Sequence, residues 1–142
     1  MFRMVYILIV DDDSRLTCIM NEWLCEKGHC VSVYNNPRML LENIGTLDYD
    51  IAFVDASIAG SKLTQILPDG NEIIKELKKY YPDRAIVCMS GQLLPEDKPK
   101  FADAFLSKPF RYSYDGRPNC VSLEGTIGRM SGLIEKRRKK LS

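Results

Sequence analysis

Three carboxylates occupy positions in this sequence where they could act together on one cation. Asp11 and Asp12 directly follow the apolar run 5–10, and Asp55 directly follows the apolar run 51–54. Three carboxylates in one crevice repel one another and lose solvation unless a cation compensates them. Mg²⁺ prefers oxygen ligands and keeps several waters, which leaves coordination positions for the phosphate oxygens of a donor. The pattern therefore predicts a Mg²⁺ site at Asp11, Asp12 and Asp55.

A hydroxyl and a lysine follow two further apolar runs. Ser90 comes after the run 85–89, and Lys108 comes shortly after the run 104–106. Phosphoryl transfer relies mainly on positioning and charge neutralisation, so a carboxylate nucleophile, a metal ion and a nearby lysine would suit it. We therefore expect phosphoryl transfer to a carboxylate at this site.

Each of these residues alone also has a purely local explanation. Asp12 and Asp13 could stabilise the start of a following helix through its dipole, an effect of about 0.3 to 1 kcal/mol each. Asp55, Ser90 and the pair Lys108-Pro109 are residue types that are common in turns. Their joint placement after four apolar runs favours one shared site.

The elements that must position these residues are strands that alternate with helices. The run 5–10 is continuous, apolar and rich in β-branched residues, which is typical of a strand buried on both faces. Further strands are predicted at 30–34, 51–54, 85–89 and 104–106. Helices are predicted from the N-cap Ser14 to Gly28, from Asn36-Pro37 onward, from Gly70 to Pro82, and over 122–140 with Leu123, Ile127, Met130, Ile134 and Leu141 on one face.

This alternation predicts an α/β fold, with a doubly wound parallel sheet of five strands, right-handed crossovers and helices on both faces. If the strand order is 2-1-3-4-5, the first and third strands are neighbours, and Asp11, Asp12 and Asp55 converge at their carboxyl ends. Pro95 and Pro99 predict a short or irregular fourth helix.

Size and composition favour one ordinary globular domain. The chain has 142 residues, of which 45% are hydrophobic and 27% charged, which excludes the disordered, collagen-like and disulfide-dense classes. No apolar stretch is long enough to span a membrane and no signal-peptide pattern is visible, so a cytoplasmic location is expected. We predict a single domain over 1–142, with a core of about 5–110 and a last helix and basic tail of about 119–142.

The cysteines, the histidine and the basic tail suggest structural roles. The five cysteines include no C-x-x-C pair, so we interpret them as small buried apolar groups and predict neither a disulfide framework nor a zinc site. His29, the only histidine, has no second histidine with which to build a site. A basic run is most simply a solvated helix end, with contact to nucleic acid or an acidic membrane surface as the alternative. It consists of Lys136, Arg137, Arg138, Lys139 and Lys140.

Four segments resemble the response-regulator receiver family, in the family's order and over about residues 5–110. They read Ile-Leu-Ile-Val-Asp-Asp-Asp, Ala-Phe-Val-Asp, Met-Ser-Gly and Phe-Leu-Ser-Lys-Pro-Phe. The resemblance implies the flavodoxin-like strand order 2-1-3-4-5. It also implies that Asp55 is the phosphoacceptor, that Asp12 is a direct metal ligand, and that Asp11 acts largely through water. The backbone carbonyl of Ser57 would be a further metal ligand.

The resemblance also implies a switch and a set of partners. Ser90 would turn its hydroxyl toward the phosphate, Phe105 would rotate inward, and Lys108 would pair with the phosphate before a cis peptide bond to Pro109. A histidine kinase or a histidine phosphotransfer protein would supply the phosphoryl group. The chain would then be a stand-alone receiver that signals to a downstream protein by contact, with a homodimer as one possible assembly. It would be no enzyme beyond accepting the phosphoryl group and slowly losing it.

Two segments depart from the family pattern. Asp69-Gly70 follows Asp55 at a longer distance than is usual, and the extra segment 56–68 is interpreted as a lid that tunes donor access or acyl-phosphate hydrolysis. A tolerated surface insertion is the alternative. A second insertion after Phe110 contains Asp115-Gly116, which predicts a small β-hairpin near 112–121.

Two other functions remain open at this point. In the first, the chain is a pseudo-receiver, a constitutive interaction module whose long loop blocks the metal or the donor. In the second, it is a phosphohydrolase of the haloacid dehalogenase type, which also attacks with an aspartate after a first strand. That class typically has Asp-x-Asp-Gly-Thr, whereas the chain has Asp11-Asp12-Asp13-Ser14 and lacks the Gly-Thr continuation.

Overall fold

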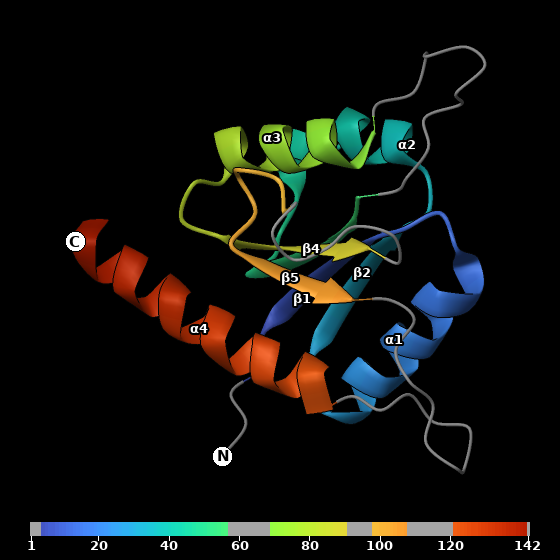
Figure 1. Ribbon diagram of the computed structural model, residues 1–142, viewed down its shortest axis with the longest axis horizontal. Coiled ribbons are helices and arrows are strands. Elements are labelled where there is room, and N and C mark those ends of the chain that lie inside the picture. The colour runs from blue at the N-terminus through green and yellow to red at the C-terminus, as the bar shows by residue number, and fades with distance from the viewer. Residues whose placement is uncertain (1–3, 57–68, 91–97, 108–120, 142) are drawn as a thin grey trace.

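Five parallel strands form one sheet in the order β2-β1-β3-β4-β5 (Figure 1). The computed structural model describes residues 4–56, 69–90, 98–107 and 121–141. The strands are β1 (Tyr6–Val10), β2 (Cys30–Tyr34), β3 (Ile51–Asp55), β4 (Ala85–Ser90) and β5 (Ala104–Ser107). The predicted α/β fold and its strand order are therefore confirmed.

Helices cover both faces of this sheet, as predicted. Those within the described ranges are α1 (Ser14–Glu26), α2 (Pro37–Glu42), the 3₁₀ helix η1 (Ile44–Thr46), α3 (Gly70–Tyr80) and α4 (Val121–Leu141). α1 and α4 lie on one face, and α2 and α3 lie on the other (Figure 1). The short or irregular helix that was predicted between β4 and β5 falls mainly on residues 91–97, which are outside the described ranges.

Each face of the sheet has its own apolar core, because successive side chains of a strand point to opposite faces. In β3, Ile51 and Phe53 pack on the side of α1 and α4, whereas Ala52 and Val54 pack on the side of α2 and α3. Every residue of β3 is buried. This explains why the sequence of the strand is a continuous apolar run rather than an alternating one.

Three strands are one residue longer than predicted. Asp55 and Ser90 are the last residues of β3 and β4 and not the first residues beyond them, and β5 includes Ser107. The register explains the difference, since Asp55 still pairs with Met89, and Ser90 pairs with Ser107. The backbone therefore continues the ladder after the apolar pattern has ended.

The start of α1 differs from the prediction by one residue. Asp13, and not Ser14, is the N-cap, and its carboxylate accepts hydrogen bonds from the backbone N–H groups of Arg15 (3.1 Å) and Leu16 (3.2 Å). Asp13 has an extended backbone, whereas Ser14 is already helical. Gly28 follows the helix with φ of 90°, a conformation that glycine adopts without strain, which confirms its predicted role in ending α1.

α4 lies across the amino end of the sheet, which is the end where the strands begin. Near its start, Glu124 pairs with Lys27, the C-cap of α1, with 3.7 Å between Oε1 and Nζ. Near its end, Arg138 Nη2 lies 3.0 Å from Oδ1 of Asp50, the residue before β3. Arg137 pairs with Asp103, the residue before β5. Ion pairs therefore attach α4 to α1 and to the beginnings of two strands.

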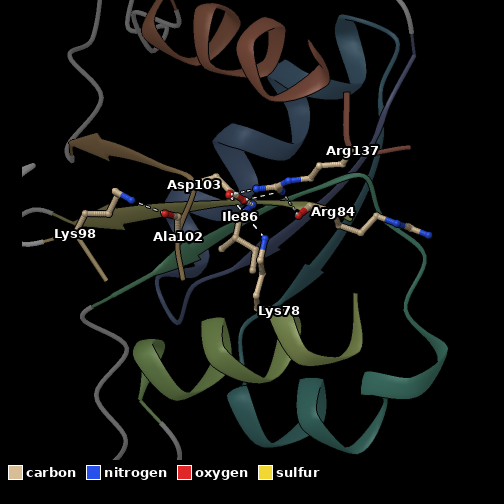
Figure 2. Close-up of polar contacts among 7 residues, drawn as sticks. All are labelled: Lys78, Arg84, Ile86, Lys98, Ala102, Asp103 and Arg137. Carbon is tan, nitrogen blue, oxygen red and sulfur yellow. Dashed lines mark hydrogen bonds and ion pairs between the residues drawn. The ribbon is translucent and has the colours of Figure 1, made fainter. Parts of the chain in front are cut away.

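Asp103 is the centre of the polar network at this end (Figure 2). Its Oδ2 accepts a hydrogen bond from the backbone N–H of Ile86 (2.9 Å), and its Oδ1 pairs with Arg137 and lies 3.8 Å from Lys78 Nζ. Arg137 also donates to the backbone carbonyl of Arg84 (3.0 Å). The network joins α3, β4, β5 and α4.

The basic run 136–140 is therefore only partly the solvated end that the sequence suggests. Lys136 and Lys140 are exposed, but Arg137 and Arg138 make ion pairs with the sheet. The predicted apolar face of α4 is correct for Leu123, Ile127, Met130 and Ile134, which are buried. It is wrong for Leu141, which is 75% exposed because the helix extends past the sheet (Figure 1).

The prediction for the cysteines is wrong for three of the four that lie in the described ranges. Cys18, Cys25 and Cys30 are exposed, and only Cys88 is buried, while Cys120 lies outside those ranges. Cys18 and Cys25 are on the solvent side of α1, and Cys30 begins the outer strand β2.

His29 has the structural role that the sequence suggests. It is buried, and its Nδ1 accepts a hydrogen bond from the backbone N–H of Val5 (3.2 Å). Burial lowers the pKa of its imidazole below 6.5, because the charged form loses solvation.

Candidate functional site

The three carboxylates converge at the carboxyl end of the sheet, where the strands finish. Asp11 and Asp12 follow β1, and Asp55 ends the neighbouring β3. One carboxylate oxygen from each residue lies within 4.8 Å of the other two. Asp11 and Asp55 are 0% and 3% exposed, whereas Asp12 is open to solvent. The cluster thus combines two buried carboxylates with one that solvent can reach.

The short loop from Asp11 to Asp13 is held by several hydrogen bonds. The backbone N–H of Asp11 donates to the carbonyl of Tyr34 at the end of β2 (3.1 Å). The backbone N–H of Asp13 donates to Oδ1 of Asp11 (2.9 Å), while the Asp13 carboxylate caps α1. Asp13 therefore orients the Asp11 carboxylate through its backbone and does not contribute to the acidic cluster through its side chain.

Gly70 brings the start of α3 against the backbone of the acceptor strand. A Cβ at this position would lie 2.2 Å from the backbone oxygen of Asp55 and 2.8 Å from Cα of Ala56. No other residue type fits without moving the chain. Asp69 caps the same helix by accepting from the backbone N–H of Glu72 (2.9 Å). The Asp69-Gly70 pair is visible in the sequence, but its close approach to Asp55 is not.

The predicted switch residues lie on the two strands beyond β3. Ser90 ends β4 and is buried, and the backbone N–H of Ala56 donates to the carbonyl of Met89 next to it (2.8 Å). Phe105, in β5, pairs with Cys88 of β4 and is half-buried on the α2 and α3 side of the sheet. Ser90 therefore lies one strand away from Asp55, and Phe105 two strands away.

Several predicted features fall outside the described residues. These are Ser57 with its carbonyl ligand, Lys108 with the cis peptide bond to Pro109, most of the lid at 56–68, and the hairpin near 112–121.

The electrostatic field of the cluster affects a neighbouring thiol. Cys88 lies on β4 opposite Val54, the residue before Asp55. Burial, and to a smaller extent the negative charge of Asp55, raises the pKa of its thiol to about 11. The thiol therefore stays protonated at neutral pH and is a poor nucleophile.

The donor set fits Mg²⁺. All three side chains offer carboxylate oxygens, which are the hard ligands that this ion prefers, and Asp12 leaves one side open for water or phosphate. A Mg²⁺ shell with bonds of about 2.1 Å is about 4.2 Å across. The carboxylate oxygens of the cluster lie within 4.8 Å of one another, which is close to this span.

None of the helices in the described part of the chain has the length and apolar character that crossing a membrane requires.

Comparison with known proteins gives one family-model match and several relatives. The family model described as the response regulator receiver domain matches residues 7–113. The transcriptional regulatory protein TcrA of Mycobacterium tuberculosis is 25% identical over 130 residues, which are 88% of this chain and 49% of TcrA. This chain therefore spans about half the length of that relative.

Solved structures with the same fold include response regulator TrrA of Thermotoga maritima in complex with Mg²⁺-BeF. It is 22% identical, with a TM-score of 0.71, and the match covers 89% of this chain and 99% of that one. A second structure, histidine kinase ThkA in complex with TrrA, matches with 22% identity, a TM-score of 0.69, and coverage of 89% and 98%. At this identity, the likeness shows the fold alone.

Proposed function

Because this chain belongs to the response regulator receiver domain family, we propose that it accepts a phosphoryl group on Asp55 in a Mg²⁺-dependent transfer. The observation that carries the proposal is the convergence of Asp11, Asp12 and Asp55 at the carboxyl ends of two neighbouring strands. The ion would be held by Asp12, Asp55 and the backbone carbonyl of Ser57, with Asp11 acting largely through water. When bound, it would neutralise charge on the carboxylates and on the phosphoryl oxygens.

Asp55 acts as the nucleophile in this proposal. One of its carboxylate oxygens attacks phosphorus, the bond between phosphorus and the donor's histidine nitrogen breaks, and an acyl phosphate forms. Asp55 ends a strand whose residues are all buried, so its backbone is fixed before the donor arrives. The position of the acceptor then needs little reorganisation during transfer.

Ser90, Lys108 and Phe105 complete the proposed switch. Lys108 pairs with the phosphoryl group, and the Ser90 hydroxyl turns toward it. Phosphorylation adds a charge of about −1.5 to −2, which biases an existing equilibrium between two conformations. Phe105 reports the change by rotating inward, and the altered surface contacts a downstream protein.

The proposed donor is a phosphohistidine on a histidine kinase or on a histidine phosphotransfer protein. Support comes from the structure of TrrA, which is in complex with the histidine kinase ThkA. A cytoplasmic location is part of this proposal. That the chain is a stand-alone receiver, and that its only chemistry is phosphoryl acceptance and slow self-dephosphorylation, stay predictions.

The experiment that tests the function is intact-mass measurement after incubation with acetyl phosphate and Mg²⁺. We expect one added phosphoryl group on the parent chain and none on Asp55→Asn. Asp48→Asn is the matched control, because Asp48 is an exposed aspartate at the other end of the sheet, and it should be phosphorylated like the parent.

Two outcomes would contradict the proposal. No adduct on the parent at any Mg²⁺ concentration would favour the pseudo-receiver. Repeated turnover of a phosphate ester would favour a phosphohydrolase of the haloacid dehalogenase type.

A further inference from the structure

The acidic cluster depends on a loop of only three residues, so the contacts that fix this loop determine where two of the three carboxylates lie. The loop, Asp11 to Asp13, connects β1 to α1. Within the described part of the chain, a side chain from a distant part of the sequence reaches it. This is Asn35, which comes directly after β2 and lies 24 positions from Asp11 in the sequence.

Asn35 makes two hydrogen bonds with one amide group. Its Nδ2 donates to the backbone carbonyl of Asp11 (2.8 Å) and to the hydroxyl oxygen of Thr17 (3.1 Å). Thr17 is buried in the first turns of α1, and its own hydroxyl donates to the carbonyl of Ser14 (3.1 Å). The Thr17 oxygen is therefore oriented as an acceptor toward Asn35, and both Nδ2 hydrogens have a partner.

We infer that Asn35 is a positioning residue for the Mg²⁺ site, an inference that rests on the proposed function. Its amide fixes the loop at both ends, at the carbonyl of Asp11 and at the first turns of α1. The Asp11 carbonyl belongs to the same residue as one of the clustered carboxylates, and Asp12 is the next residue. Without the amide, Asp11 and Asp12 sample more positions relative to Asp55, and binding a cation must then restrict them again.

The chain provides a matched control in the neighbouring Asn36. The side chain of Asn36 accepts from the backbone N–H of Arg38 (2.9 Å) and caps α2. Asn35→Ala and Asn36→Ala therefore remove the same side chain from adjacent positions. Only the first change removes a contact with the Asp11 loop.

The first measurement is the dissociation constant for Mg²⁺ by titration calorimetry. Asn35→Ala should raise it about threefold to tenfold, the loss expected for one or two hydrogen bonds that orient ligands. Asn36→Ala should leave it unchanged. Thr17→Val keeps the volume of the side chain but removes one of the two acceptors of Asn35, so it should raise the dissociation constant by a smaller factor. This variant replaces Asn35→Ala in the test if Asn35→Ala does not fold.

The second measurement needs no metal and separates this inference from the proposed function. In the metal-free protein, hydrogen exchange of the Asp13 amide, which donates to Asp11 Oδ1, should be about threefold faster in Asn35→Ala than in Asn36→Ala. Equal exchange rates, or equal Mg²⁺ dissociation constants, would overturn the role of Asn35. A parent chain that binds no Mg²⁺ would instead refute the proposed function, and the exchange rates would still decide the positioning role.

Discussion

The two ends of the sheet arrange their acidic side chains in opposite ways. At the carboxyl end, three carboxylates of the same sign lie within 4.8 Å of one another. At the amino end, Asp103 is surrounded by Arg137, Lys78 and the backbone N–H of Ile86 (Figure 2). The amino end thus places two cationic side chains of the protein beside its carboxylate.

This difference indicates what each end contributes. A buried charge is tolerated when it is paired and hydrogen-bonded, so the network at Asp103 can stabilise the fold without any ligand. The carboxylates at the other end gain from an external cation, and their stability therefore depends on what they bind. We expect substitutions at the amino end to change folding, and charge substitutions at the carboxyl end to change the response to Mg²⁺.

The largest effect should come from disturbing the carboxyl end sterically rather than electrically. Gly70→Ala would place a Cβ 2.2 Å from the backbone oxygen of Asp55, so α3 and β3 must separate. We expect a loss of about 3 kcal/mol or more in the free energy of unfolding, measured by urea denaturation. Gly128→Ala is the control, because its Cβ would meet nothing within 4 Å, and it should stabilise the protein by up to about 1 kcal/mol.

Breaking the network at the amino end should lower the free energy of unfolding by a somewhat smaller amount. Asp103→Ala removes the side-chain acceptor of the Ile86 N–H and the carboxylate that pairs with Arg137 and Lys78. We expect a loss of about 2 to 3 kcal/mol in the same denaturation experiment, and little change in the Mg²⁺ dissociation constant. A loss below about 0.5 kcal/mol, which is typical of exposed ion pairs, would contradict the assignment of this network as structural.

His29 should make the stability of the amino end sensitive to acid. The pKa of this side chain is lowered in the folded protein, so the unfolded chain takes up its proton first as the pH falls. The contribution of His29 to the free energy of unfolding should be fully present above pH 6.5 and should decrease as the pH falls below this value. His29→Gln should flatten this dependence between pH 7 and 5, as followed by thermal unfolding, and an unchanged slope would contradict the role of His29.

The smallest effect should come from reducing the charge at the carboxyl end. Asp12→Asn relieves repulsion within the cluster, and because Asp12 is exposed we expect only about 0.5 kcal/mol of added stability without metal. The stabilisation that Mg²⁺ gives the parent should be much reduced in this variant. Thermal unfolding with and without Mg²⁺ measures both effects, and equal stabilisation of the two chains would count against Asp12 as a ligand.

The sequence was sufficient for the strands and for the convergence of the acidic residues. Apolar, β-branched runs such as 51–54 are typical of strands buried on both faces, and the strand order that the family resemblance implies places the acidic residues together at their carboxyl ends. The exposure of Cys18 and Cys25 could also have been predicted, because they are seven positions apart and lie away from the apolar stripe of α1.

Other contacts left no readable pattern in the sequence. Asn35 reaches the Asp11 loop, and Arg137 reaches Asp103, across 24 and 34 positions. Neither follows a helical or strand repeat, because both depend on the tertiary arrangement of elements that are far apart in the chain. The sequence allows polar residues between elements to be classified as turn or surface residues, but it does not show which residues they contact.

The position of α4 across the amino end has a consequence for the order of folding. Its anchors are distant in sequence, with 88 positions between Asp50 and Arg138, and Gly125, Gly128 and Gly132 weaken the isolated helix. Contacts that close such long loops form late, so α4 should dock after the sheet has assembled. Its ion pairs would then be absent from the folding transition state, and weakening them should accelerate unfolding while leaving the folding rate nearly unchanged.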